Sequence, residues 1–106
     1  MQQNILYIAG ATGYIGREVV MHALELGYVV HASTRGKPLS DLVHHDNLIV
    51  DYIKAHGNKT KFNIPTGAVV ISCLSSKKGT AQEAEDIDYH MNMALLNCAQ
   101  SRNASV

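Results

Sequence analysis

Apolar residues are grouped along the chain in two ways, as short continuous runs and as helical repeats. Continuous runs occupy residues 5–9, 28–34 and 68–74, and a fourth, at 47–51, is a weaker candidate. Runs of this kind are typical of strands covered on both faces of a sheet. Two other segments carry apolar residues three or four positions apart, which predicts amphipathic helices. The apolar positions are Ile15, Val19, Ala23 and Leu26 in the first helix, and Ala84, Ile87, Met91, Ala94, Leu95 and Cys98 in the second.

Glycine and polar residues separate these elements. Gly27 predicts the end of the first helix, residues 63–67 form a turn, and Thr80 with Glu83 has capping-box spacing for the second helix. Residues 36–67 otherwise show no clear period. Strands that alternate with helices are typical of a parallel sheet with helical crossovers, so we expect an α/β fold with helices on both faces of the sheet.

A glycine-rich turn joins the first predicted strand to the first predicted helix. Residues 10–16 read GATGYIG. In a strand–turn–helix unit, Gly10 permits the tight turn, Gly13 lets the backbone approach a diphosphate, and Gly16 lets the helix pack closely on the strand. The N–H groups at the start of the helix then face the anion. The alternative is a purely structural turn, but the flanking elements favour a dinucleotide site.

Arg35 follows the second predicted strand, about 20 residues after the glycine turn. In dinucleotide-binding folds an acid near this place binds the ribose 2′-hydroxyl of NAD, whereas an arginine accommodates the 2′-phosphate of NADP. No acid occurs between Glu25 and Asp41, and Arg17 and Lys37 would add positive charge. The sequence therefore favours NADP(H) over NAD(H). The alternative is that Arg35 is a solvated loop cation.

Composition limits the classes of function open to the chain. Its 106 residues suit a single domain, and its nine basic residues balance nine acidic ones, which argues against nucleic acid as the main partner. The two cysteines lie in apolar surroundings, which favours a reducing compartment and predicts a cytoplasmic protein. No apolar run approaches the ~20 residues of a membrane span. Because the first strand begins close to residue 1, we also expect no signal peptide.

The middle of the chain holds two further candidates for chemistry. His44, His45 and Asp46 suggest a metal site, but adjacent side chains diverge and no further ligand follows at a suitable spacing. We therefore expect a solvated loop there and no metal site. Asp51 follows the weaker strand candidate, where an acid often lies near the adenine of a dinucleotide, and a binding role for it is the weaker interpretation. Met91 and Cys98 are interpreted as packing residues.

Four features together resemble a known family. They are the GATGYIG turn, Arg35 after the second strand, the run SCLSS at 72–76 and IDY at 87–89. The combination is similar to the atypical short-chain dehydrogenase/reductases, which have a Rossmann-type parallel sheet. Within that group the chain most resembles divinyl chlorophyllide (protochlorophyllide) 8-vinyl reductases, enzymes of chlorophyll biosynthesis. Isoflavone-reductase-like and NmrA-like proteins share the turn and the basic residue.

The resemblance implies roles for particular residues of an NAD(P)-binding Rossmann domain at 1–106, the N-terminal portion of the full fold. Arg35 would hold the 2′-phosphate of NADP(H), and Cys73, Leu74 and Ser75 would run past the ribose. The residues expected around the diphosphate are Gly10, Thr12, Gly13, Tyr14 and Ile15, with Gly16 completing the turn. The chain departs from the family at Asp88, where many relatives carry asparagine, and after the third strand, where relatives have a Gly-Asp pair and then a helix.

The family's proton donor is missing from these residues. Relatives carry a Tyr-x-x-x-Lys segment and a substrate region further along, and none of the five tyrosines here has a lysine four residues later. We therefore expect no catalytic residue in 1–106 and no turnover by this chain alone, since both substrate positioning and a proton source would be missing.

Three interpretations of the function remain open. The chain is the NADPH-binding portion of a reductase that passes hydride to a conjugated small-molecule substrate in the complete protein, or a stand-alone NADP-sensing or regulatory module of the NmrA-like kind, or an inactive homologue. In each case we expect an exposed strand at the edge of the sheet to favour self-association.

Overall fold

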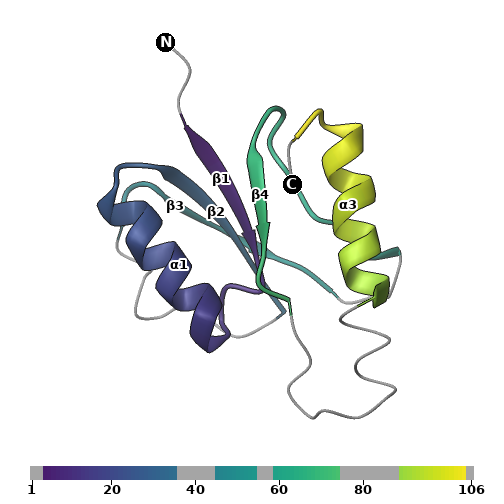
Figure 1. The fold of residues 1–106 in the computed structure, drawn as a ribbon, viewed down its shortest axis with the longest axis horizontal. Coiled ribbons are helices and arrows are strands. Elements are labelled where there is room, and N and C mark those ends of the chain that lie inside the picture. Colours follow the sequence, from purple (N-terminus) through teal and green to yellow (C-terminus); the bar gives the residue numbers. More distant parts are fainter. Residues whose placement is uncertain (1–3, 36–44, 55–58, 75–88, 105–106) are drawn as a thin grey trace.

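The strands form one parallel sheet in the computed structural model, which describes residues 4–35, 45–54, 59–74 and 89–104 (Figure 1). The strands are β1 (Ile5–Ala9), β2 (Val29–Thr34), β3 (Leu48–Tyr52) and β4 (Val69–Ser72), in the order β3-β2-β1-β4. The predicted α/β fold with a parallel sheet is confirmed, and the weaker strand candidate at 47–51 forms β3.

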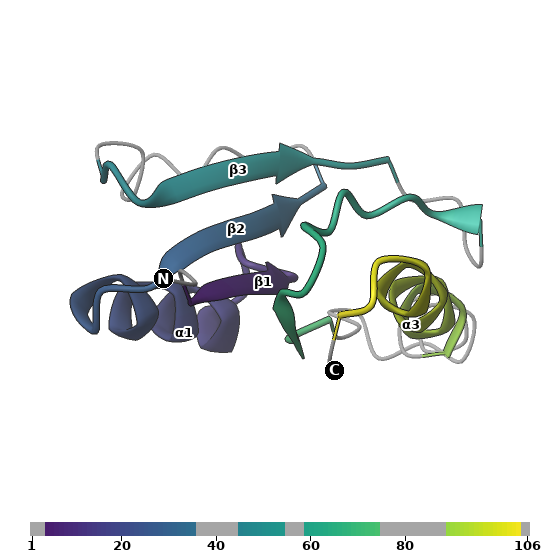
Figure 2. The same ribbon diagram turned by 90° about the horizontal axis from the view of Figure 1, so that it is seen from above.

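Two helices cover opposite faces of the sheet (Figure 2). They are α1 (Tyr14–Glu25), which connects β1 to β2, and α3 (Asn92–Ser101), which follows β4. The predicted start of the second helix, with Thr80, Glu83, Ala84 and Ile87, lies outside the described residues. In the part of the chain that the structure describes, no helix is long and apolar enough to cross a membrane.

The order of the strands reverses beside β1. The chain leaves β1 toward β2 and β3 on one side and later returns to β4 on the other side. In open parallel sheets this reversal leaves a crevice at the carboxyl ends of the strands, and ligands bind there. The topology therefore marks the end of β1, where the glycine turn begins, as the position of a site.

Successive residues of a strand point to opposite faces of the sheet, and a core lies on each face. Tyr7 of β1 and Val70 of β4 pack toward α3, in a core that contains Met91 and Leu95. Ile8 belongs to the core beneath α1, with Val20, Val30 and Ala32. Met91 is buried and Cys98 packs at the edge of the α3 core, so both are packing residues, as predicted.

The predicted apolar face of α1 is partly wrong. Ala23 is buried and Val19 half-buried, but Ile15 is 69% exposed and Leu26 is 76% exposed. The face that meets the sheet instead contains Gly16, Val20, Ala23 and Leu24. Gly16 decides this orientation, because a Cβ there would lie 2.1 Å from the carbonyl oxygen of Gly10 and only a glycine face can come so close. The helix ends at Glu25, and Gly27, the predicted stop signal, follows two residues later with a φ of 88°.

Candidate functional site

The glycine turn lies at the carboxyl end of β1 and is held by its two neighbouring strands. Gly10 has a φ of 79°, and a Cβ at this residue would lie 2.7 Å from the carbonyl oxygen of Cys73, at the end of β4. On the other side, the N–H of Gly10 donates to Ser33 Oγ at 3.3 Å and the N–H of Ala11 donates to the carbonyl of Ser33 at 3.0 Å. Both the backbone conformation and the close packing therefore require glycine at position 10.

Gly13 occupies a position where the chain itself does not require glycine. Its φ of −72° and ψ of 167° are open to any residue. Within the described residues, the nearest atom to a Cβ at this position is the Gly10 carbonyl oxygen, at 3.7 Å, which is an ordinary contact. Gly13 is also the N-cap of α1, where serine, aspartate and asparagine are preferred over glycine by a few tenths of a kcal/mol. An open space remains where a side chain would normally cap the helix.

The start of α1 has the character of an anion site. No side chain among the described residues caps it, and its first turn, residues 14–17, contains no acid. The first N–H groups of a helix have no partner within the helix, and the helix dipole places partial positive charge there. The open space beside Gly13 and these N–H groups together suit a phosphate group that approaches the backbone closely.

A crevice connects the glycine turn to the ends of the neighbouring strands. Its lining comprises Gly10, Thr12, Gly13, Ser33, Thr34, Arg35, Ile53, Cys73 and Leu74. The structure thus brings together the turn residues at 10, 12 and 13 with Arg35 from the end of β2 and the segment that follows β4. These positions are separated by up to 64 residues in the sequence, from Gly10 to Leu74, and meet because parallel strands end at the same edge.

Three residues of this lining, Ser33, Thr34 and Ile53, were not predicted. Ile53 directly follows β3, and its N–H donates to the carbonyl of Thr34 at 2.9 Å, which continues the β2–β3 ladder by one residue. The signal that would have found them is the same one that identifies Arg35, namely a position at the carboxyl end of a strand beside β1. For Ile53 that signal depends on β3, which the apolar pattern indicates only weakly.

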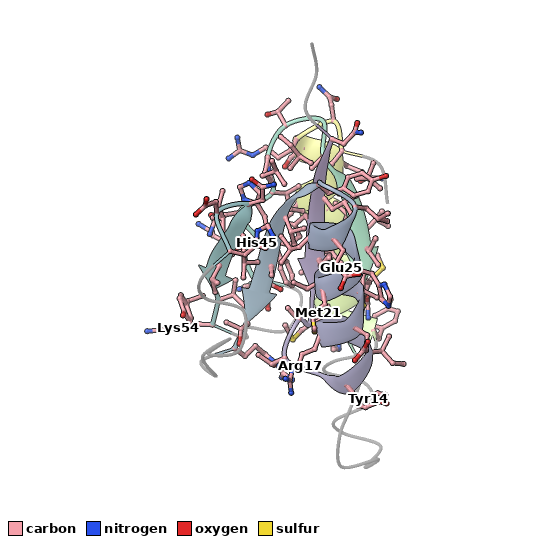
Figure 3. The ribbon with its side chains drawn as sticks, turned by 90° about the vertical axis from the view of Figure 1, so that its left-hand side faces the viewer. Tyr14, Arg17, Met21, Glu25, His45 and Lys54 are labelled. Atoms are coloured by element: carbon pink, nitrogen blue, oxygen red, sulfur yellow. The ribbon has the colours of Figure 1, made fainter. Side chains whose placement is uncertain are left out.

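Other predicted site residues lie elsewhere. The side chains of Tyr14 and Ile15 are exposed on α1, outside the crevice lining, and Gly16 is buried against Gly10. The predicted positions Ser75 and Lys37 lie outside the described residues, as do Asp88 and His44. Figure 3 shows Arg17 and Lys54 at the same end of the molecule as Tyr14, so two cations accompany Arg35 at the end where the strands terminate.

Cys73 forms an apolar wall of the crevice. Its N–H donates to the carbonyl of Ala9 at 2.8 Å, which extends the pairing of β4 with β1. Burial raises the pKa of the Cys73 thiol above its ordinary value. The thiol is therefore neutral near pH 7, and a neutral thiol is a weak nucleophile.

Asp51 has a structural role away from the crevice. Its carboxylate accepts hydrogen bonds from Tyr7 Oη at 2.5 Å, from the Asn63 N–H at 3.0 Å and from Asn63 Nδ2 at 2.7 Å. Asp51 does not line the crevice, which leaves the weaker interpretation of an adenine contact without support. His45 accepts the N–H of Asn47 in a local turn, and the described residues contain no group of three metal-binding side chains.

Comparisons with known proteins agree with this fold. A sequence profile of the NAD dependent epimerase/dehydratase family matches residues 6–106. No curated protein is significantly similar to the chain. The solved structure of an SsCR variant is similar over 95% of this chain and 34% of its own, with a TM-score of 0.63 and 14% identity. Gre2 from Candida albicans is similar over 92% of this chain and 33% of its own, with a TM-score of 0.60 and 18% identity. The chain thus spans about a third of the length of these structures, and at such identities the likeness shows the fold alone.

Proposed function

Because the chain belongs to the NAD dependent epimerase/dehydratase family, we propose that its crevice is the dinucleotide site of a reductase and that it binds NADP(H). The observation that carries this proposal is Gly13. Neither the backbone conformation nor the surrounding space requires glycine there, and serine, aspartate and asparagine are better N-cap residues. A ligand that approaches the backbone closely explains the missing side chain.

Each part of the crevice has a task in this proposal. The glycine turn and the first N–H groups of α1 hold the diphosphate, since both present N–H donors and neither presents an acid. Ile53 offers an apolar surface to the base, and Cys73 and Leu74 pass the ribose. When bound, the dinucleotide supplies or accepts a hydride at its nicotinamide ring. The chain's own residues bind and orient it.

The first test replaces Gly13 with valine. The branched side chain fits the backbone but fills the space proposed for the diphosphate, so Gly13→Val should abolish binding of NADP⁺ and leave secondary structure in place. Calorimetric titration and circular dichroism on the same sample measure the two effects. If Gly13→Val bound NADP⁺ as the parent chain does, the ligand would have to lie elsewhere.

The preference for NADP(H) rests on Arg35. A guanidinium at the end of β2 can bind a 2′-phosphate with two hydrogen bonds, and no acid competes for the ribose hydroxyl nearby in the sequence. Loss of a charge-assisted hydrogen bond costs roughly 1.5–3 kcal/mol, so Arg35→Asp should lower the affinity for NADP⁺ by about one to two decades. The matched control is Arg102→Asp, at an exposed arginine just after α3. Equal affinities of the parent chain for NADP⁺ and NAD⁺ would contradict this preference.

We further propose that the hydride acceptor in the complete protein is a conjugated tetrapyrrole. This part is supported by the resemblance of the GATGYIG, SCLSS and IDY segments to divinyl chlorophyllide 8-vinyl reductases. Because residues 1–106 contain no Tyr-x-x-x-Lys segment, the short chain should bind NADPH without oxidising it.

An NADPH-oxidation assay with a divinyl tetrapyrrole tests whether residues 1–106 only bind NADPH and the rest of the protein is needed to oxidise it. It compares the 106-residue chain with a chain extended through further strands, and Gly13→Val provides the background rate. Turnover by the extended chain alone is the expected result. Turnover by the short chain would refute this proposal, whereas binding without turnover in both would favour the NADP-sensing module.

A further inference from the structure

Three polar side chains lie next to one another on the face of the sheet that α3 covers. Tyr7 on β1 and Ser33 on β2 are 0% and 1% exposed, and Asp51 on β3 is half-buried. Ser33 and Asp51 are direct neighbours in the register of β2 with β3. The Tyr7 ring packs edge-on against Phe62, at 6.2 Å between ring centres, which fixes the direction of its hydroxyl.

These side chains are joined by hydrogen bonds that run in one direction. The N–H of Gly10 donates to Ser33 Oγ at 3.3 Å, and Tyr7 Oη donates to Asp51 Oδ2 at 2.5 Å. Burial raises the pKa of the Tyr7 phenol far above its ordinary value, the bond to Asp51 raises it further, and a hydrogen bond with Ser33 opposes the rise. Tyr7 Oη gives its only proton to Asp51, so its oxygen can only accept from Ser33, and the Ser33 hydroxyl is the donor toward Tyr7.

This series of hydrogen bonds therefore starts at the glycine turn and ends on the Asp51 carboxylate. Each hydroxyl accepts from the group before it and donates to the group after it, and hydrogen bonds linked in this way polarise one another. Asn63 completes the last member of the series, because its N–H and its Nδ2 both donate to the Asp51 carboxylate. The carboxylate is thus fixed from both sides.

Ser33 is the link to the nucleotide site. It binds the turn twice, through Oγ to Gly10 and through its carbonyl to Ala11, and it also lines the crevice. The directions of the N–H groups that follow, from Thr12 to the first turn of α1, depend on how these two residues are held. A change of a few tenths of an ångström in the turn would move those N–H groups away from a diphosphate.

We propose that Tyr7 and Asp51 are positioning residues of the dinucleotide site. They act through Ser33 to hold the backbone N–H groups of the glycine turn in the position that the diphosphate requires. This inference rests on the proposed binding of NADP(H). Neither side chain lines the crevice, so their effect on the ligand passes through the backbone of the turn.

The test compares two ligands on the variant Tyr7→Phe, which removes the hydroxyl and keeps the ring. NADP⁺ uses the diphosphate position, whereas 2′-AMP has the adenine, ribose and 2′-phosphate but no diphosphate. In Tyr7→Phe, the dissociation constant of NADP⁺ should rise about tenfold, equivalent to ~1.4 kcal/mol, while that of 2′-AMP stays within about twofold. The matched control is Tyr52→Phe, which removes a hydroxyl from an exposed tyrosine on β3.

A double substitution tests the route through Ser33. In a Ser33→Ala background the turn has already lost its contact with Oγ, so Tyr7→Phe should add little further loss of NADP⁺ affinity. If circular dichroism shows that Tyr7→Phe does not fold, Asp51→Asn provides the same comparison of ligands with nearly unchanged shape.

The outcomes separate this inference from the proposed function. A parent chain that does not bind NADP⁺ refutes the proposed function and this inference with it. Unchanged NADP⁺ affinity in the folded variant refutes only the positioning role. Equal loss of affinity for NADP⁺ and 2′-AMP also overturns it, because a general loss of structure would affect both ligands alike. Full additivity of Tyr7→Phe and Ser33→Ala in the loss of NADP⁺ affinity overturns it too, because the effect of Tyr7 would then not pass through Ser33.

Discussion

The same substitution at two glycines three residues apart should have opposite consequences. Gly13 and Gly16 belong to one motif, and alanine adds a single methyl group at either. At Gly16 that methyl group would meet the Gly10 carbonyl oxygen at 2.1 Å, whereas at Gly13 the same atom lies 3.7 Å away. We predict that Gly16→Ala destabilises the fold and that Gly13→Ala spares the fold and weakens nucleotide binding.

The cost at Gly16 follows from the overlap. A distance of 2.1 Å is short of ordinary contact by more than about 1 Å, and the opposing atom is backbone, so no change of rotamer relieves it. Overpacking typically costs about 1–3 kcal/mol, and an overlap this large against backbone lies at the upper end, at about 3 kcal/mol. Alanine gains roughly 1 kcal/mol in helix propensity. The cost of the overlap exceeds the gain in helix propensity. We therefore expect Gly16→Ala to lower the free energy of unfolding by about 2 kcal/mol, or Tm by some 8–16 °C for a domain of this size.

The terms at Gly13 nearly cancel. A φ of −72° suits alanine, which stabilises by about 0.4–1 kcal/mol through the unfolded state, and an alanine N-cap costs a similar amount. We expect a change in stability within about 0.5 kcal/mol and an increase in the NADP⁺ dissociation constant of at least about tenfold.

Thermal unfolding and calorimetric titration of both variants provide the comparison. The reasoning is refuted if Gly16→Ala is as stable as the parent chain, because the helix would then not be in the contact described. It is refuted equally if Gly13→Ala binds NADP⁺ without loss, because the open space would then not belong to the ligand.

Three further predictions concern other parts of the molecule. Saturating NADP⁺ should slow the alkylation of Cys73 by N-ethylmaleimide and leave that of Cys98 unchanged, as measured by mass spectrometry. Because burial raises the pKa of the Cys73 thiol, its alkylation should be slow near pH 7 and faster at higher pH. Burial lowers the pKa of His31, so on acidification the unfolded chain takes up a proton at about pH 6.5, before the folded chain does. The free energy of unfolding, measured with urea, should therefore fall as the pH drops below that value. His31→Gln should make this fall less steep. Val69 is 47% exposed on β4, and Val69→Lys should reduce self-association in sedimentation velocity if the edge of the sheet mediates it; unchanged association would point to another surface.

The sequence is most informative about the fold where one residue type has one physical cause. Apolar runs predict β1, β2 and β4 because a strand covered on both faces must be apolar throughout. The pattern is weaker for β3, where Asp51 replaces an apolar residue to accept hydrogen bonds from Tyr7 and Asn63. Those partners come from distant parts of the chain, and no local period reveals them.

The apolar face of α1 could not be assigned from spacing alone. Two apolar stripes overlap on this helix, and Gly16 decides which of them meets the sheet because it sets the closest approach. In the site, the turn and Arg35 follow from the motif and its distance along the chain, and both line the crevice. Ser33 and Ile53 enter the lining through the pairing of strands, which is a tertiary property.

The position of β1 has a consequence for how the two halves of the crevice move. β1 is hydrogen-bonded on both sides, to β2 and to β4, whereas among the described residues β3 pairs with β2 alone. Elements paired on both sides exchange their amide hydrogens through the largest openings of a protein, and singly paired edges exchange through smaller ones. The glycine turn continues from the first kind of element and Ile53 from the second. We therefore expect the wall proposed for the diphosphate to be anchored in the slower-exchanging part of the sheet, and the wall proposed for the base to open without unfolding it.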